Sequence, residues 1–183
     1  MCGIVGIVNF KKDIKEQERL ISEMFQTLDK RGPDESGLYL DHNVNLGHKR
    51  LSILDIENGK QPMSYTVNEN TYTIVYNGQI YSSNELRNLL IQKGFDFKGH
   101  SDTEVLLKSY IYFGKDVLKH LNGIYAFAIW NQNEKELFLA RDHFGIKPLY
   151  YTIRNGNFIF ASEIKAILKH PDVKTQINLD RNR

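Results

Sequence analysis

The sequence contains a single cysteine, Cys2, among its 183 residues. One cysteine excludes an intrachain disulfide and any zinc site built from cysteine thiolates. The six histidines show no tight metal-ligand spacing, so we expect no metal site in this chain. The Gly-x-x-x-x-Gly-Lys-Ser/Thr loop that cradles nucleotide phosphates is also missing. These absences leave a lone thiol near the start of the chain as the most distinctive chemical group.

Strong charge of one sign and long apolar runs are missing as well. Lys and Arg number 24 against 22 Asp and Glu, a net charge of +2, and the basic residues are scattered along the chain. This balance argues against nucleic acid or an anionic membrane as a partner. No apolar run approaches the roughly 20 residues that a membrane-spanning helix needs. The N-terminus lacks the layout of a secretory signal, so we expect a cytoplasmic protein. No feature indicates an oligomeric state.

Short segments rich in β-branched and aromatic residues, separated by turn residues, predict a protein rich in strands. Asn155-Gly156 between two of these segments is a strong hairpin signal. The strands are predicted at residues 3–9, 37–40, 44–48, 51–54, 71–76, 124–130, 137–141, 149–153 and 158–161.

Helix starts are indicated where a capping residue is followed three residues later by Glu. Such pairs occur at Asp13/Glu16, Ser82/Glu85 and Ser101/Glu104. Arg31-Gly32-Pro33, Gly94 and Gly114 are expected to end these helices, and a last helix is predicted over residues 163–169. Strands joined by hairpins, with helices inserted in blocks, predict an α+β fold built on antiparallel sheets. We assign residues 1–173 to one domain and residues 174–183 to the start of a linker.

Removal of Met1, which is usual before a small residue, would make Cys2 the N-terminal residue with a free α-amine. The thiol, with a pKa near ~8.5, would then lie beside a free α-amine with a pKa near ~7.7–8.0. One residue would supply both the nucleophile and its base, so no histidine partner is needed. The alternative is that Cys2 is a small apolar residue leading into a buried strand.

Seven motifs, in order along the chain, carry a resemblance to the class II glutamine amidotransferases, a branch of the N-terminal nucleophile (Ntn) hydrolases. Within this family the sequence resembles the glutaminase domain of glutamine-hydrolysing asparagine synthetases. The resemblance implies a four-layer αββα sandwich of two antiparallel sheets. The motifs are MCGIVGI at residues 1–7, RGPD at 31–34, HKRLSI at 48–53, YNGQIY at 76–81, SDTE at 101–104, ARD with GIKPLYY at 140–151, and ASE at 161–163.

The resemblance assigns catalytic roles to three residues. Cys2 is the nucleophile, and the Asn77 side-chain amide and the Gly78 backbone N–H form an oxyanion hole. Two neutral donors suit a developing oxyanion, and glycine permits close backbone approach. The alternative for Asn77-Gly78 is an ordinary turn. RGPD is interpreted as a helix stop that braces the Cys2 segment, and the segment 140–151 as a surface toward a partner domain.

The resemblance also assigns a glutamine clamp. Arg50 would bind the α-carboxylate, for which a guanidinium fork is well suited, and Asp102 would bind the α-ammonium. Gln79 stands where the family usually has Glu, also directed at the ammonium, so its charge is lost here. The alternatives are a surface salt bridge for Arg50 and a helix-start carboxylate for Asp102. Backbone groups of Leu51, Ser52, Ile53 and Leu54 would line the same pocket.

The implied reaction is hydrolysis of glutamine to glutamate and ammonia through a Cys2 γ-glutamyl thioester, with no cofactor in this chain. The ammonia would pass in cis to a synthetase domain that uses ATP and Mg²⁺; the Ser-Gly-Gly-x-Asp-Ser loop of that domain is not in this sequence. Two alternatives stay open: the glutaminase domain of another amidotransferase, and a glutamine-binding module without turnover. An Ntn amidase for another substrate is disfavoured, because Arg50 and Asp102 together suit an amino acid.

Overall fold

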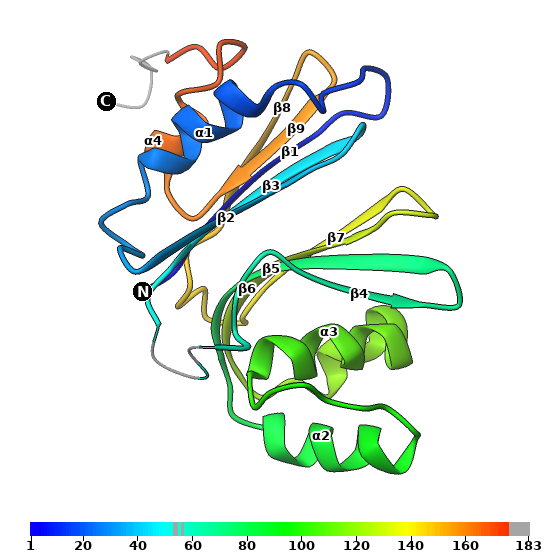
Figure 1. Ribbon diagram of the computed structural model, residues 1–183. Coiled ribbons are helices and arrows are strands. Elements are labelled where there is room, and N and C mark those ends of the chain that lie inside the picture. Colours follow the sequence, from blue (N-terminus) through cyan, green and yellow to red (C-terminus); the bar gives the residue numbers. More distant parts are fainter. Residues whose placement is uncertain (53–54, 56, 176–183) are drawn as a thin grey trace.

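Two antiparallel β-sheets stack face to face, and a layer of helices covers the outer face of each sheet (Figure 1). The structure is a computed structural model that describes residues 1–52, 55 and 57–175. The strand orders are β2-β3-β1-β9-β8 in the first sheet and β4-β5-β6-β7 in the second. The four-layer αββα sandwich predicted from the sequence is confirmed. Within the described residues, no helix is long and apolar enough to cross a membrane.

The first and last parts of the chain build the first sheet, and the middle builds the second. The first sheet contains β1 (Gly3–Val8), β2 (Glu35–Leu40), β3 (Val44–Arg50), β8 (Tyr150–Arg154) and β9 (Asn157–Ala161). The second contains β4 (Met63–Val67), β5 (Asn70–Ile80), β6 (Gly123–Asn131) and β7 (Glu136–Arg141). The helices are α1 (Glu18–Gln26) and α4 (Ile164–Ile167) over the first sheet, α2 (Ser83–Gln92) and α3 (Asp102–Phe113) with the 3₁₀ helix η1 (Gly114–Lys119) on the side of the second.

Three apolar layers fill the spaces between the four structural layers. Alternation along β5 shows how one strand serves two of them. Ile74 and Tyr76 face α3 in the outer core, whereas Val75 faces Ile4 and Phe160 in the core between the sheets. Each fully buried aliphatic side chain contributes roughly 1.5–3 kcal/mol relative to an exposed one. A third cluster packs α1 and α4 onto the first sheet.

β1 is the central strand of the first sheet and pairs antiparallel with both β3 and β9. All six of its residues are buried. A Cβ on Gly6 would lie 2.3 Å from the ring of Phe160 on the neighbouring strand, so only glycine fits at this crossing. This register fixes where the chain enters β1, and therefore where Cys2 lies.

The predicted strands differ from the structure in three main places. Met63–Val67, where no strand was predicted, is the edge strand β4, whose alternating exposure matches its apolar–polar alternation. β5 continues beyond its predicted end at residue 76 to Ile80. The predicted strand at 51–54 is wrong for Leu51 and Ser52, which lie beyond the end of β3. Ile53 and Leu54 are outside the described residues.

Helix boundaries follow the predicted signals only in part. The hydroxyl of Ser101 accepts from Thr103 N and caps α3, but Ser82 makes no cap bond and instead joins His120 and Asn122. α1 begins at Glu18, later than predicted, and α4 covers only Ile164–Ile167. The stops at Gly94 and Gly114 hold, with φ of 88° and 59°, whereas α1 ends at Gln26, before the predicted stop at Arg31-Gly32-Pro33. The Asn155-Gly156 hairpin also holds, with φ of 50° and 80°.

Candidate active site

Cys2 immediately precedes the central strand β1 and is partly buried. Because Gly3 pairs with Lys49 of β3, the end of β3 runs alongside Cys2. The Leu51 backbone N–H donates to the Cys2 sulfur at 3.5 Å, and the thiol lies 3.8 Å from the Leu51 carbonyl oxygen. The thiol is therefore held by backbone groups of the segment that the sequence assigned to the substrate pocket.

A cavity of about 230 Å³ opens in front of Cys2. Seven residues predicted for the site line it together, although they are up to 100 positions apart: Cys2, Arg50, Leu51, Asn77, Gly78, Gln79 and Asp102. Ser52 is not among the lining residues, and Ile53 and Leu54 are outside the described part of the chain. We call this space the Cys2 cavity. Its remaining lining residues are Met1, Gly59, Gln61, Tyr76, Ser101, Thr103, Ile124 and Lys147.

The RGPD segment braces Cys2, as the sequence suggested. Arg31 Nε donates to the Cys2 carbonyl oxygen at 2.9 Å, and Arg31 Nη1 pairs with Glu163 at 3.2 Å. Asp34 accepts from the Ser52 backbone N–H at 2.7 Å. One turn therefore holds the start of β1 and the segment after β3, on the two sides of the thiol. While Met1 is attached, the α-nitrogen of Cys2 is an amide and cannot act as a base.

Asn77 lies on β5 with its side chain 2% exposed. Its Nδ2 is buried and has no hydrogen-bond partner within residues 1–52, 55 and 57–175. A buried donor left unpaired costs about 1–3 kcal/mol, so such groups are uncommon in folded proteins. Asn77 also lines the Cys2 cavity, so its amide is a candidate donor for an acceptor bound there.

A second donor comes from the backbone of Gly78. Its cross-strand neighbour Tyr125 directs both its N–H and its C=O to Asp142, so Gly78 faces away from β6. The same edge of β5 presents Tyr76 N to Gln61 Oε1 at 2.6 Å and Ile80 N to Asp102 at 3.0 Å. By the two-residue repeat of a strand, Gly78 N lies between these two and points to the Cys2 cavity.

Only glycine fits at position 78. A Cβ there would lie 2.3 Å from the Ile124 carbonyl oxygen and 2.7 Å from the Tyr76 ring. The Asn77 amide and the Gly78 N–H thus belong to a strand rather than to the turn considered from the sequence.

Asp102 is the first residue of α3, directly after the cap Ser101. Its Oδ2 accepts from the Tyr76 hydroxyl at 2.7 Å and from Ile80 N at 3.0 Å. Burial raises the pKa of Asp102 above its usual value, although both hydrogen bonds act to lower it. A carboxylate in such a position favours a cationic partner in the cavity.

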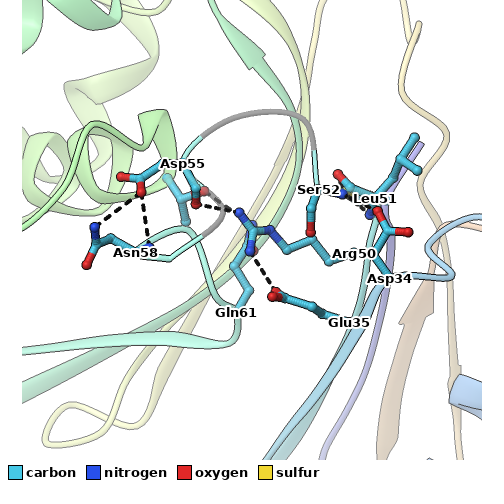
Figure 2. A network of polar contacts seen from close by, with 10 residues as sticks. Asp34, Glu35, Arg50, Leu51, Ser52, Asp55, Asn58 and Gln61 are labelled. Atoms are coloured by element: carbon cyan, nitrogen blue, oxygen red, sulfur yellow. Dashed lines mark hydrogen bonds and ion pairs between the residues drawn. The ribbon is translucent and has the colours of Figure 1, made fainter.

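Arg50 ends β3 and is 4% exposed. Nη1 pairs with Glu35 at 2.6 Å, and Nη2 donates to the Asp55 carbonyl oxygen at 2.7 Å (Figure 2). The salt bridge considered from the sequence therefore exists, but it is nearly buried and lies at the cavity wall. Gln79 is exposed at the opening of the cavity.

The sequence matches a known protein family over nearly its whole length. The model of the glutamine amidotransferase domain family matches residues 1–182. The chain belongs to this family. It is 50% identical over 178 residues to asparagine synthetase [glutamine-hydrolyzing] 3 of Bacillus subtilis, covering 97% of this chain and 29% of that protein. It is 48% identical over 170 residues to asparagine synthetase [glutamine-hydrolyzing] 1 of the same organism, covering 92% and 27%.

A solved structure supports the glutamine amidotransferase fold. The glutamine phosphoribosylpyrophosphate amidotransferase of B. subtilis superposes with a TM-score of 0.77 at 24% identity, over 91% of this chain and 43% of that one. At this identity the likeness concerns the fold. The chain spans less than a third of the length of the two synthetases it matches.

The amidotransferase site also contains residues that the sequence reasoning missed. Gln61 bridges two elements, because its Oε1 accepts from Tyr76 N and its Nε2 donates to the Thr103 hydroxyl at 3.2 Å. Tyr76 contributes its hydroxyl to Asp102. Alternation along β5 could have predicted that the side chains of Tyr76 and Asn77 point to opposite faces of the sheet. Nothing in the sequence indicates the long-range contacts of Gln61. In the described residues, no group of three or more His, Cys, Asp or Glu could hold a metal.

Proposed function

We propose that this chain, once Met1 is removed, hydrolyses glutamine to glutamate and ammonia at Cys2. One observation carries the proposal: Cys2, the sole thiol of the chain, and Asn77, whose buried Nδ2 has no hydrogen-bond partner among the described residues, line one cavity. A nucleophile beside preorganised donors is the arrangement that acyl transfer requires.

The α-amine of Cys2 takes the thiol proton, and the sulfur attacks the side-chain carbonyl carbon of glutamine. The resulting oxyanion accepts hydrogen bonds from Asn77 Nδ2 and Gly78 N. Collapse of this intermediate breaks the C–N bond, and the ammonium of Cys2 returns its proton to the leaving ammonia. Water, deprotonated by the same amine, then hydrolyses the thioester to release glutamate and restore the thiol.

Two further residues that line the Cys2 cavity orient the substrate. Arg50 takes the α-carboxylate and Asp102 the α-ammonium, which orients the amide toward Cys2. Arg50 already pairs with Glu35, and the Glu35 carboxylate compensates part of the positive charge of Arg50. An amino acid without net charge is therefore a better ligand than a dianion. Gln79 offers a neutral carbonyl near the ammonium, where a carboxylate would add charge.

The names of the two synthetases extend the proposal to the whole protein. We propose that the ammonia passes in cis to an ATP- and Mg²⁺-dependent synthetase domain that forms asparagine. The residues for ATP and Mg²⁺ would belong to that domain, and no step in this chain involves them. The exposed side chains of Phe144 and Ile146, in the segment interpreted as a domain contact, are available for such an interface.

The test uses protein whose Met1 removal is established by intact mass. We expect glutamate and ammonia to appear in equal amounts, and Cys2→Ala to abolish turnover while still binding glutamine by calorimetry. Protein that retains Met1 should have the same fold but be inactive. This control removes only the free α-amine of Cys2. Full turnover by Cys2→Ala would refute the proposal. Glutamine binding without turnover by the trimmed wild type would favour the non-catalytic module instead.

A further inference from the structure

Asp55 does not line the Cys2 cavity, but it contacts Arg50 and also His100, which lies just before the helix that begins with Asp102. Its backbone carbonyl oxygen accepts from Arg50 Nη2 at 2.7 Å and from Gly59 N at 2.9 Å. Its carboxylate points the other way, where Oδ2 accepts from His100 N at 2.5 Å. Figure 2 shows the guanidinium of Arg50 between Glu35 on one side and Asp55 on the other.

The carboxylate contact reaches the helix that begins with Asp102. His100 lies two residues before Asp102, and Ser101 between them is the cap of α3. Burial alone would raise the pKa of Asp55, but hydrogen bonds from His100, Asn58 and Ser101 outweigh it and lower this pKa. Asp55 is therefore ionised at neutral pH, and a charge at the start of a helix is favourable.

The residues around Asp55 are closely packed, so a shift of Asp55 would also shift its neighbours. A Cβ on Gly59 would lie 2.4 Å from Arg50 Nη2, and a Cβ on Gly99 would lie 2.3 Å from Asp55 Oδ2. Asn58 closes the turn, donating to Asp55 Oδ1 through its backbone N at 3.1 Å and its Nδ2 at 3.2 Å. Two glycines thus allow approaches that any other residue would block.

We propose that Asp55 is a positioning residue that sets the spacing between Arg50 and Asp102, and through it the affinity for glutamine. The inference rests on the proposed function. A free amino acid presents its carboxylate and its ammonium at a fixed separation, so Arg50 and the start of α3 must be held at a matching separation. Asp55 connects the two sides by itself. Its backbone carbonyl accepts from Arg50, and its carboxylate accepts from His100, which lies before Asp102.

The proposal predicts which kinetic constant responds. Asp55 has no hydrogen bond to Cys2, Asn77 or Gly78 in the structure, so its loss should raise KM and leave kcat within about threefold. A purely structural cap would lower the melting temperature and leave KM unchanged. The split between KM and kcat therefore separates positioning from folding.

The experiment compares Asp55→Ala with Asp13→Ala, each protein trimmed of Met1. Asp13 is a matched control: its carboxylate also accepts a backbone N–H, from Lys15 at 2.9 Å, its pKa is also lowered, and it is not part of the cavity wall. We expect Asp55→Ala to raise KM for glutamine about ten- to a hundredfold and Asp13→Ala to leave it unchanged. Asp55→Asn keeps one carbonyl acceptor and should fall between, which preserves the test if Asp55→Ala folds poorly.

A double-mutant cycle with Arg50→Ala tests whether Asp55 acts through Arg50. If Asp55 acts through Arg50, its removal should raise KM less in the Arg50→Ala background than in the wild type. Strictly multiplicative effects would overturn the proposed coupling. So would an unchanged KM in Asp55→Ala and Asp55→Asn while the wild type and Asp13→Ala turn over normally, a result that leaves the proposed function intact.

Failure of the proposed function gives a different pattern. If the trimmed wild type binds glutamine without turnover, the Kd measured by calorimetry replaces KM, and the same fold-changes decide the role of Asp55. If the wild type neither binds nor hydrolyses glutamine, both proposals are overturned.

Discussion

The hydroxyl of Tyr76 donates a 2.7 Å hydrogen bond to Oδ2 of Asp102 inside the Cys2 cavity. Burial raises the pKa of Asp102, and this hydrogen bond opposes the rise. The hydrogen bond from Tyr76 on β5 therefore favours the ionised form of the carboxylate proposed to hold the α-ammonium of glutamine. The relationship links substrate affinity to pH.

Tyr76→Phe should make glutamine binding fail at a higher pH than in the wild type. Without the hydroxyl, the pKa of Asp102 rises further, so protonation as the pH falls removes the ammonium partner earlier. We expect the acid-side increase in KM to move to higher pH, with kcat less affected. KM measured from neutral pH down to about pH 4 tests this. Tyr72→Phe, a hydroxyl loss elsewhere on β5, should leave the profile in place.

Asn77→Ala should lower kcat by ~10²–10³ and change KM little, because the amide contacts an oxyanion that exists only in the transition state. The unpaired Nδ2 in the structure predicts that this substitution does not greatly destabilise the fold, since no hydrogen bond of that atom is lost. Steady-state kinetics and thermal melting check the two parts. A raised KM with unchanged kcat would show a ground-state contact instead.

Gln79→Glu should tighten glutamine, and Asp102→Asn should weaken it. Loss of the charged hydrogen-bond partner at position 102 costs roughly 1.5–3 kcal/mol, about ten- to a hundredfold in KM. The gain at position 79 should be smaller, because Gln79 is exposed and a new carboxylate would repel Asp102. Neither variant should change kcat much. Weaker binding by a folded Gln79→Glu protein would place residue 79 away from the ammonium.

Stability should fall as the pH drops from about 6.5 to about 4, in part because of His48. Burial lowers the pKa of His48 to about 4 from 6.5, so in this window the unfolded chain binds a proton that the folded chain does not. Linkage then makes the free energy of unfolding decrease toward acid, by up to about 3 kcal/mol from this residue. Nothing is gained or lost from His48 above pH 6.5.

Urea unfolding at a series of pH values measures this slope. His48→Gln should have a shallower slope over the window, whereas His143→Gln, at an exposed position, should match the wild type. His170, whose pKa is also lowered by burial, should keep part of the slope in His48→Gln. An unchanged slope in His48→Gln would show that His48 is not buried in its neutral form.

The sequence determined the fold class and named the residues predicted for the site. Local signals were enough for β1, the first part of β5, the Asn155-Gly156 hairpin and the cap at Ser101, because each depends on residues within a few positions of one another. The motif order selected Cys2, Arg50, Asn77 and Asp102, and all four line one cavity. Their catalytic and binding roles stay predictions.

Only the tertiary structure decided how those residues are held. Ser82 does not cap the helix as expected but bonds to partners about 40 positions away. Glu104 accepts from Lys98 N and Gly99 N and also pairs with Lys108. Gln61 reaches Tyr76 and Thr103, and Asp55 reaches Arg50 and His100. Such contacts depend on the strand register and on the stacking of layers. Residues distant in the chain become neighbours only when β1, β3 and β5 pack together, and no local pattern encodes that proximity.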